Sequence, residues 1–312
     1  MEHYVTLFDS LFLPQGLALH ASLQRHAGAH RLWILCVDEP THDVLAKLAL
    51  PDVTLIRLSQ VETPELQAVK PTRSKGEYCW TLTPFAPRFV FEADASVTRV
   101  TYVDADLWLM KSPQPVFSEL EASGAAVLIT DHAYAPEFDQ SVDYGQYCVQ
   151  FMTFVRGPSE PVRKWWEERC IEWCYGRAED GKFGDQKYLD DWPQRFAGLV
   201  HVLQQQDLAL APWNATRFPL ARAVFFHFHG LRILPARRVD LSPIYPLPRP
   251  LLRHVYEPYV QQLRAAADRL AQAGFTLRPQ AQPPGWHDWL RRSVGGARQQ
   301  LWKWHRLNFR SY

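Results

Sequence analysis

The sequence is short of cysteine, of long apolar runs and of any excess of one charge. Its 312 residues include five cysteines, an odd number, and none of them forms a CxxC pair. A fold stapled by disulfides is therefore excluded, and reduced thiols are indicated. Lys and Arg total 34 against 33 for Asp and Glu, which excludes a chain that is basic or acidic throughout. No apolar stretch approaches the roughly 18 residues of a membrane-spanning helix.

What the sequence does contain is enough apolar residues to bury a large core. They make up 47% of the chain, and charged residues 21%, which excludes intrinsic disorder. The length fits one large α/β domain with a smaller appendage. Residues 1–9 carry an acid at position 2 and only a short apolar stretch, which is typical of neither signal nor transit peptides. We therefore expect a cytoplasmic protein that does not cross a bilayer.

Strand-like and helix-like stretches alternate along the N-terminal part of the chain. Apolar strands are predicted over 4–8, 32–37 and 53–58, with helices after Pro14 and over 41–50. This βαβα order predicts an α/β fold with a mostly parallel sheet flanked by helices. Ligands bind such sheets at the carboxyl ends of the strands, so residues directly after each strand are the candidates for function.

Two carboxylates, Asp104 and Asp106, stand directly behind a predicted strand over 97–103. At a spacing of i, i+2 on an extended chain, both side chains point the same way. Hard divalent cations such as Mg²⁺ and Mn²⁺ prefer oxygen ligands and bridge protein carboxylates to substrate phosphates. The pattern indicates a metal diphosphate site. A turn cap, or a chance occurrence, is the alternative interpretation.

Four segments carry a resemblance to a known family, and they occur in that family's order. They are 7–10, 102–108, 183–189 and 227–230. Together they resemble the GT-A fold glycosyltransferases that use nucleotide sugars, more specifically the family 8-like enzymes of the bacterial lipopolysaccharide and glycan type. The resemblance covers about residues 3–235 and implies a Rossmann-like sheet that binds a nucleotide diphosphate sugar.

The resemblance implies that Mn²⁺ or Mg²⁺ is held by Asp104, Asp106 and His227. His227 follows the apolar run 223–226, so it leaves a strand end much as Asp104 does. A neutral imidazole is an acceptable Mn²⁺ ligand beside carboxylates. His229 would share the same face in an extended segment and is the fallback ligand. The alternative is that both are packed or surface histidines.

Five further residues are assigned to the donor and to catalysis. The resemblance implies that Phe8, Asp9 and Ser10 grip the nucleoside at the end of the first strand. It also implies that Asp185 binds sugar hydroxyls and that Gln186 lies near the anomeric carbon. A solvated charged turn is the alternative for this last pair.

Three arginines are candidate partners of the donor. Arg88 faces the donor by resemblance, and the guanidinium of Arg232 suits a diphosphate. The family has a lysine three residues after the glycine that corresponds to Gly230, whereas this chain has Arg232 two residues after it. Arg73 belongs to a basic stretch that either closes over the diphosphate or carries ordinary solvated charges.

The position of Arg232 is one departure from the family's pattern, and a second concerns a strand. Where the family has an Asn-Ala-Gly strand that contacts the sugar, this chain has residues 147–151.

A long helix is predicted over 159–175, from Ser159 as the N-cap to Gly176 just past its end. Its tryptophans follow the i, i+3, i+4 pattern and are predicted to pack in the core. Cys170 and Cys174 lie one turn apart on this helix. Without a second pair of ligands, we interpret them as core packing rather than as a metal site.

The composition changes towards the C-terminus. Five prolines fall between 235 and 250, where they break both helix and sheet, and a helix is predicted over 255–273. We divide the chain into a transferase domain over 1–235, a proline-rich crossing with a helix over 236–284, and a tail over 285–312.

The tail carries six Lys and Arg against one acid, with tryptophans at near-helical spacing. A basic amphipathic helix of this kind suits the headgroup layer of an anionic membrane surface. We predict that it contacts the inner leaflet, with an oligomer interface or nucleic-acid binding as the alternatives. The remaining residues hold 28 basic against 32 acidic side chains. The nearly neutral net charge of the whole chain is therefore the sum of a basic tail and a mildly acidic remainder.

The predicted function is metal-dependent transfer of a hexosyl group from a nucleotide diphosphate sugar, such as a UDP-hexose, to a glycan or lipid-linked acceptor. The resemblance implies retention at the anomeric carbon. The predicted location is the cytoplasmic face of the membrane, without nucleic acid as a partner. The alternative from another class is a non-catalytic sugar- or membrane-binding scaffold on a degenerate transferase fold. A nucleotidyltransferase would want a Gly-rich N-terminal loop, which 8–11 does not supply.

Overall fold

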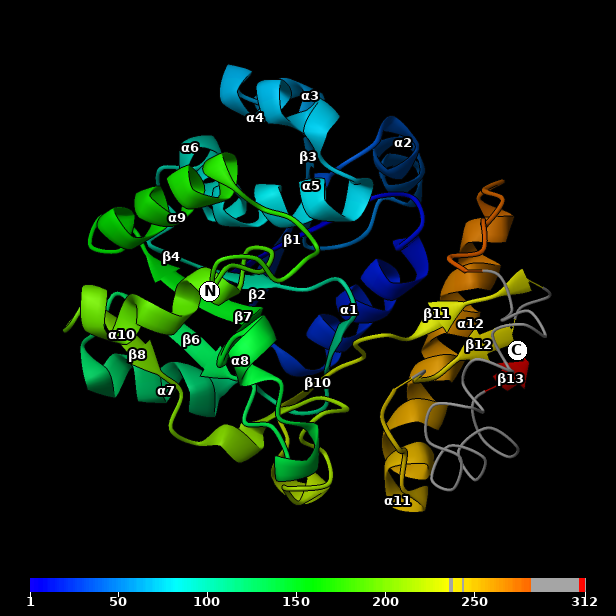
Figure 1. Ribbon diagram of the computed structural model, residues 1–312. Helices are drawn as coiled ribbons and strands as arrows, with labels where there is room; N and C mark the ends of the chain where they lie inside the picture. The colour runs from blue at the N-terminus through cyan, green and yellow to red at the C-terminus, as the bar shows by residue number, and fades with distance from the viewer. Residues whose placement is uncertain (236–237, 243, 282–308, 312) are drawn as a thin grey trace.

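The computed structural model describes residues 1–235, 238–242, 244–281 and 309–311. Its centre is a seven-stranded sheet of order β3-β2-β1-β4-β7-β6-β8, shown in Figure 1. Neighbouring strands are parallel except where β7 pairs with β4 and β6. The predicted α/β class with a mostly parallel sheet is confirmed. The strands are β1 Glu2–Phe8, β2 His30–Cys36, β3 Val53–Arg57, β4 Arg99–Val103, β6 Val127–Asp131, β7 Tyr147–Val155 and β8 Val200–Val202.

Helices cover both faces of this sheet, which explains why its central strands are nearly continuous apolar runs. Two clusters of buried side chains mark the two faces. The first face is covered by α1 Leu13–His26, α2 Glu39–Leu48 and α7 Gln114–Ser123. The second is covered by α4 Pro64–Val69, α5 Lys75–Leu82, α6 Ala86–Ala93, α9 Glu160–Glu172 and α10 Trp192–Arg195. Two short helices, α3 Leu58–Val61 and α8 Ser141–Tyr144, lie in connections.

Side-chain caps fix where two helices near the carboxyl edge begin. Asp38, two residues after β2, accepts the backbone N–H of Thr41 at 3.1 Å and starts α2. Ser74 and Glu77 form a reciprocal capping box that starts α5. Each such cap contributes about 1 kcal/mol. The basic stretch around Arg73 therefore runs into a helix rather than forming one long loop.

The helix predicted over 159–175 is shorter than expected, because α9 spans Glu160–Glu172. The Ser159 side chain makes no cap, and Trp173 is already extended, with its carbonyl accepting the Tyr188 hydroxyl at 2.8 Å. The tertiary contact therefore ends the helix before Gly176. Trp166 is fully buried, and Cys170 and Cys174 are free thiols buried in the same apolar cluster. These three residues pack in the core, as predicted.

Two small sheets flank the main one. The first has the order β5-β10-β9, and the second β11-β12-β13. Their strands are β5 Leu107–Leu109, β9 Ala209–Leu210, β10 Phe225–His227, β11 Arg232–Ile233, β12 Arg238–Asp240 and β13 Phe309–Ser311. The predicted tail lies outside the described residues except for β13, which pairs antiparallel with β12.

The C-terminal helix packs on the body beside α1 (Figure 1). It is α12 Glu257–Gln272, preceded by α11 Arg249–Leu251 and a π-helical turn over Leu252–Tyr256. Its Tyr259 ring stacks on Phe228, directly after β10, with centroids 3.5 Å apart. In the part of the chain that the structure describes, no helix is both long and apolar enough to cross a membrane.

Candidate metal and donor site

Asp104, Asp106 and His227 come together at the carboxyl edge of β4. Asp104 directly follows β4, and the backbone turns at once, because the N–H of Leu107 bonds to the Asp104 carbonyl at 3.0 Å. This turn starts β5 with Asp106 just before it. His227 is the last residue of β10 and lies opposite Leu107 in the antiparallel β5–β10 pair. The sheet register therefore brings residues more than 120 positions apart into one group.

The three side chains face one another closely. Nε2 of His227 lies 3.2 Å from Oδ1 of Asp106 and 3.5 Å from Oδ2 of Asp104. One ligand atom from each residue lies within 4.8 Å of the others. The other oxygen of Asp104 accepts the Tyr102 hydroxyl at 2.9 Å, and Nδ1 of His227 lies 2.9 Å from Oε1 of Gln150.

The charges of this group are strongly coupled. Burial raises the pKa of Asp104, and the neighbouring Asp106 adds to the rise. Burial acts on Asp106 in the same sense, but His227 outweighs it and the pKa of Asp106 is lowered. Burial would lower the pKa of His227, yet the attraction of Asp106 and Asp104 holds that pKa well above its usual value. The site concentrates negative charge that a cation can neutralise.

The donor set fits a hard divalent cation. Two carboxylates and one imidazole offer oxygen and nitrogen ligands of the kind that Mg²⁺ and Mn²⁺ accept. Ligands about 2.1 Å from a central ion lie about 3–4 Å from each other, which matches the measured separations. Asp104, Asp106 and His227 would therefore hold such an ion, and substrate oxygens would supply further ligands.

Asp185 lies beside this group. Its backbone carbonyl accepts the indole N–H of Trp166 at 2.8 Å, which anchors the 183–189 loop to α9. The side chain is 3% exposed, and Oδ2 has no hydrogen-bond partner among the described residues. Burial and the Asp104 charge raise the pKa of Asp185 to about 8. A buried polar atom without a partner is costly, and a sugar hydroxyl is a suitable partner for it.

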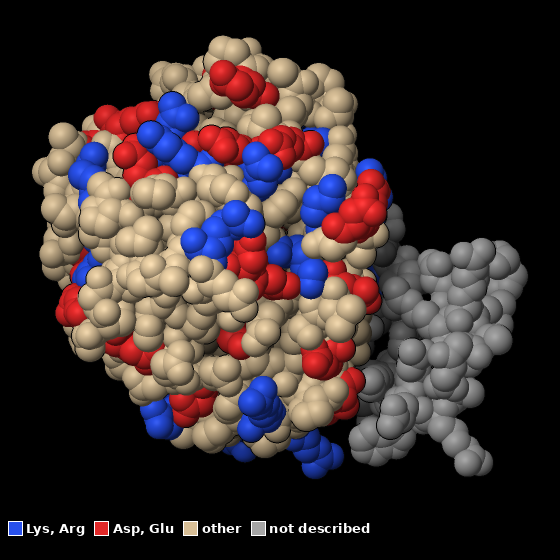
Figure 2. Space-filling model, turned by 60° about the vertical axis from the view of Figure 1, so that its left-hand side comes forward, with Lys and Arg blue, Asp and Glu red and all other residues tan. Residues whose placement is uncertain are grey.

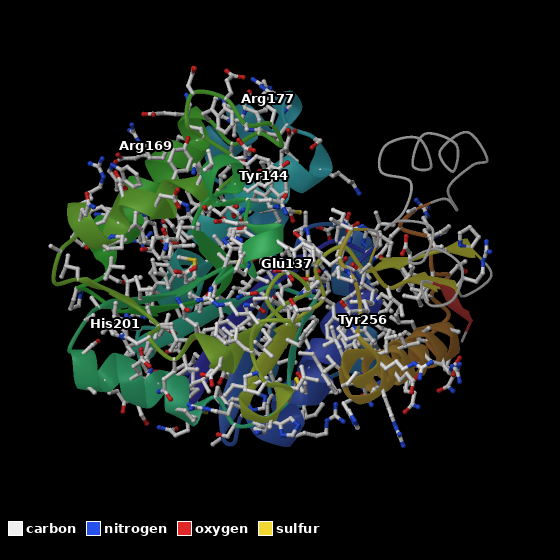
Figure 3. The ribbon with its side chains drawn as sticks, turned by 60° about the horizontal axis from the view of Figure 1, so that its bottom comes forward. Glu137, Tyr144, Arg169, Arg177, His201 and Tyr256 are labelled. Carbon is white, nitrogen blue, oxygen red and sulfur yellow. The ribbon has the colours of Figure 1, made fainter. Side chains whose placement is uncertain are left out.

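Gln186 points to α8 instead of to the Asp104 group. Its Nε2 donates to the carbonyl of Tyr144 at 2.7 Å. Tyr144, labelled in Figure 3, packs edge-on against Phe183 with centroids 4.6 Å apart. The amide nitrogen of Gln186 therefore ties the loop to α8, and its amide oxygen is the atom left for a ligand.

The end of β1 forms a second polar cluster. Oδ1 of Asp9 accepts the N–H of Leu11 at 3.0 Å, and its Oδ2 lies 3.2 Å from Nζ of Lys75. The Ser10 hydroxyl donates to Asp38 at 2.8 Å. Asp38 was not predicted as a site residue, although it lies only two residues after β2, at the same edge of the sheet as Asp104.

Phe8 is buried at the end of β1, where it contacts α1. A Cβ at Gly16 would lie 2.3 Å from Cζ of the Phe8 ring. Only a glycine therefore allows α1 to pass this close to the ring.

The three arginines have different surroundings. Arg232 lies close enough to Asp106 for its charge to help lower the pKa of that carboxyl. The Arg73 guanidinium stacks on the Tyr175 ring at 3.9 Å and donates to the Ile171 carbonyl, so it is held against the end of α9 and the segment that follows it.

The expectation for Arg88 is wrong. Arg88 pairs with Glu92 at 2.7 Å and with Glu167 on α9 at 3.7 Å. It lines a hollow together with Arg156 and Gly157, which follow β7. Because β7 runs antiparallel to β4, this hollow lies at the amino end of β4, the opposite edge from Asp104. The side chain faces α9 because α6 packs its apolar side on the sheet.

His229, the fallback ligand, is exposed and lies edge-on to Trp213 with centroids 5.4 Å apart. Among the described residues, the group with metal-ligand spacing contains His227 and not His229.

The chain has relatives of similar sequence among known proteins. No family model matches the sequence. The chain is 30% identical over 279 residues to the uncharacterized protein YfnF of Bacillus subtilis (strain 168), covering 83% of this chain and 91% of the relative. It is 26% identical over 287 residues to YfnD of the same strain, covering 87% and 91%.

Solved glycosyltransferase structures share the fold. The galactosyltransferase LgtC, in complex with donor and acceptor sugar analogues, has a TM-score of 0.51 at 14% identity, with 84% of this chain and 95% of that chain covered. Mouse xyloside xylosyltransferase 1 in its apo form has a TM-score of 0.50 at 15% identity, covering 73% and 97%. The described chain therefore has the GT-A fold of these glycosyltransferases.

Proposed function

The chain belongs to the family of the Bacillus subtilis protein YfnF, and from its GT-A fold and its Asp104, Asp106 and His227 group we propose that it is a metal-dependent glycosyltransferase. It transfers a hexosyl group from a nucleotide diphosphate sugar, with UDP-hexose as the first candidate, to a hydroxyl of a glycan or glycolipid. Retention at the anomeric carbon is part of the proposal.

The observation that carries this proposal is the Asp104, Asp106 and His227 group at the carboxyl edge of the sheet. Ligands bind α/β sheets at this edge, and Mn²⁺ or Mg²⁺ fits the donor set. When bound, the ion supplies Lewis-acid stabilisation of the negative charge that grows on the departing nucleoside diphosphate.

The chain's own residues orient the donor in this proposal. Asp9 and Ser10 hold the nucleoside beside the end of β1, where their hydrogen bonds to Leu11 and Asp38 fix the loop. Arg232, close to Asp106, adds a positive charge on the diphosphate side. Positioning and charge stabilisation account for most of the catalysis in such a site.

Asp185 is assigned to the sugar. Its unpartnered Oδ2 and its position within electrostatic range of Asp104 support a contact with a donor hydroxyl. Burial and the Asp104 charge raise the pKa of this carboxyl to about 8, and a hydrogen bond with that hydroxyl would satisfy its unpartnered oxygen. The Nε2 of Gln186 donates to the Tyr144 carbonyl, so in this proposal only its amide oxygen is left for the donor sugar.

We also propose that the protein works at the cytoplasmic surface of the membrane on a lipid-linked acceptor of the lipopolysaccharide type. The basic tail over 285–312 supports this proposal through its six Lys and Arg against one acid. Electrostatic attraction to anionic lipids contributes about 1 kcal/mol for each basic residue near the surface.

A panel of nucleotide sugars tests the donor assignment. The wild-type protein, with Mn²⁺, is screened for an increase in melting temperature with each compound, and then for hydrolysis of the compounds that bind. We expect one UDP-hexose to bind and to be hydrolysed slowly. If a nucleotide sugar binds but is neither hydrolysed nor used with any acceptor class, the result supports a non-catalytic scaffold. If no nucleotide sugar binds, the proposal is overturned.

A further inference from the structure

Gln150 is a fully buried glutamine in the middle of β7, a mostly apolar strand at the centre of the main sheet. A buried amide is costly unless it is hydrogen-bonded. Its Oε1 has one partner, Nδ1 of His227 at 2.9 Å, and its Nε2 has none among the described residues. One buried amide therefore makes a single side-chain bond, and that bond reaches the metal group.

The same residue also touches Asp104 through its backbone. The carbonyl of Gln150 accepts the N–H of Asp104 at 3.1 Å, one step beyond the antiparallel pair Val103 and Phe151. Gln150 thus links the end of β4 in the main sheet to the end of β10 in the small sheet. Two of the proposed ligands come from different sheets, and Gln150 contacts both.

The hydrogen bond decides which nitrogen of His227 is free. An amide oxygen accepts only, so Nδ1 must carry a proton to bond with Oε1. In the neutral ring Nε2 then has a lone pair, and it is Nε2 that faces Asp106 and Asp104. The opposite amide orientation would leave the proton on Nε2 and no lone pair for an ion.

Other contacts restrain the ring without replacing this bond. Trp213 lies edge-on to His227, with centroids 5.4 Å apart and an interplanar angle of 87°. The thiol of Cys148, two residues before Gln150 on β7, also contacts His227, but sulfur is a weak acceptor. The amide oxygen of Gln150 is therefore the strong acceptor for Nδ1.

We propose that Gln150 is a positioning residue that fixes the tautomer and the orientation of His227 for metal binding. This inference rests on the proposed function, because it needs an ion in the Asp104, Asp106 and His227 group. Ligand histidines generally donate their other ring N–H to such a partner, and loss of the partner weakens metal affinity about 10–100-fold.

The test measures Mn²⁺ affinity directly, without nucleotide sugar or acceptor. Free Mn²⁺ is followed by electron paramagnetic resonance during titration of the full-length wild type, Gln150→Leu and Gln150→Glu. We expect Gln150→Leu to bind about 10–100-fold more weakly and Gln150→Glu to stay within about threefold of wild type, because glutamate restores the acceptor. Equal affinity of wild type and Gln150→Leu overturns the inference.

Thr153→Val is the matched control on the same strand. Thr153 is fully buried on β7, and its hydroxyl bonds to Thr101 at 3.0 Å. This variant also replaces a buried polar group of β7 by an apolar one, but away from the metal group. It should bind Mn²⁺ as wild type does, and a loss equal to that of Gln150→Leu assigns the effect to strand packing and overturns the inference.

A measurement on the wild type keeps the proposal testable where Gln150→Leu does not fold. In protein with ¹⁵N-labelled histidine and bound Mg²⁺, nitrogen NMR should identify His227 as protonated at Nδ1. A proton on Nε2 overturns the inference. Wild-type protein that binds neither Mn²⁺ nor Mg²⁺ instead overturns the proposed metal site itself.

Discussion

At the scale of single residues, the site consists of acids whose charges are held in place by neighbouring groups. Asp104 is fixed by the Tyr102 hydroxyl, and His227 by Gln150. Asp185 is buried and has an oxygen without a hydrogen-bond partner among the described residues. These details lead to predictions about stability as well as activity.

Asp185 leads to a pH-dependent stability difference. Burial and then the Asp104 charge raise its pKa to about 8, so folding favours the protonated acid. The contribution of Asp185 to the free energy of unfolding is fully present below the ordinary aspartate pKa. It is lost as the pH rises towards the folded-state pKa of about 8. In metal-free protein, Asp185→Asn should therefore melt above wild type by a margin that widens from pH 5 to pH 8. Calorimetry that finds a margin independent of pH contradicts this assignment.

Arg88 provides a prediction of no effect. Its partners are Glu92 and Glu167 at the opposite edge of the sheet. Arg88→Ala should leave the KM for the nucleotide sugar within about twofold of wild type. Arg232→Ala, measured in parallel, should raise it by more than tenfold if the guanidinium meets the diphosphate. A large increase in KM for Arg88→Ala would contradict this prediction and indicate that Arg88 contacts the donor.

At the scale of elements, close packing between β1 and α1 fixes the start of the nucleoside cluster. Phe8 ends β1, and α1 passes its ring at Gly16. Asp9 and Ser10 follow directly, so a shift of Phe8 moves both. The same helix supports α12, which joins the C-terminal part of the described chain to the body.

Two helical glycines provide a matched pair of variants. Gly16→Ala puts a Cβ 2.3 Å from the Phe8 ring, and such overpacking costs about 1–3 kcal/mol. Gly76→Ala on α5 meets nothing within 4 Å and should raise stability by up to about 1 kcal/mol. Chemical denaturation measures both free energies of unfolding. Similar effects of the two substitutions would contradict the described contact.

The mostly parallel α/β sheet was accessible to sequence analysis, whereas the order of its strands and much of the side-chain geometry were not. The alternation of strand-like and helix-like stretches predicted the parallel sheet, and the position of Asp104 directly behind an apolar strand predicted the edge at which it lies. Arg88 could not be oriented this way, because the face that α6 presents depends on its packing against α9 and the sheet. Gln150 was hidden for a similar reason: its bond to His227 joins two sheets, and no local pattern of β7 predicts it.

At the scale of the whole molecule, charge is distributed unevenly along the chain. The tail holds six basic residues against one acid. On the face shown in Figure 2, the described basic and acidic side chains lie interspersed between broad uncharged areas. The tail is therefore the part of the sequence with charge suited to an anionic membrane.

Neutralising the tail should weaken membrane binding. Replacing Arg291, Arg292, Arg298, Lys303 and Arg306 with Gln leaves β13 unchanged, and should reduce cosedimentation with anionic vesicles at least about tenfold, at about 1 kcal/mol per charge. Neutral vesicles with wild-type protein are the control and should bind weakly. Unchanged binding to anionic vesicles would refute the membrane role of the tail.

The most direct test of the central claim is the metal dependence of donor hydrolysis. With the nucleotide sugar that binds best, turnover is measured in chelator, after Mn²⁺ is restored, and for Asp106→Asn at saturating Mn²⁺. We predict no turnover in chelator, full recovery with Mn²⁺, and a loss of at least about 100-fold for the variant, because the charge on the departing diphosphate is then poorly neutralised. Full activity in chelator, or in Asp106→Asn, would contradict a metal-dependent transferase.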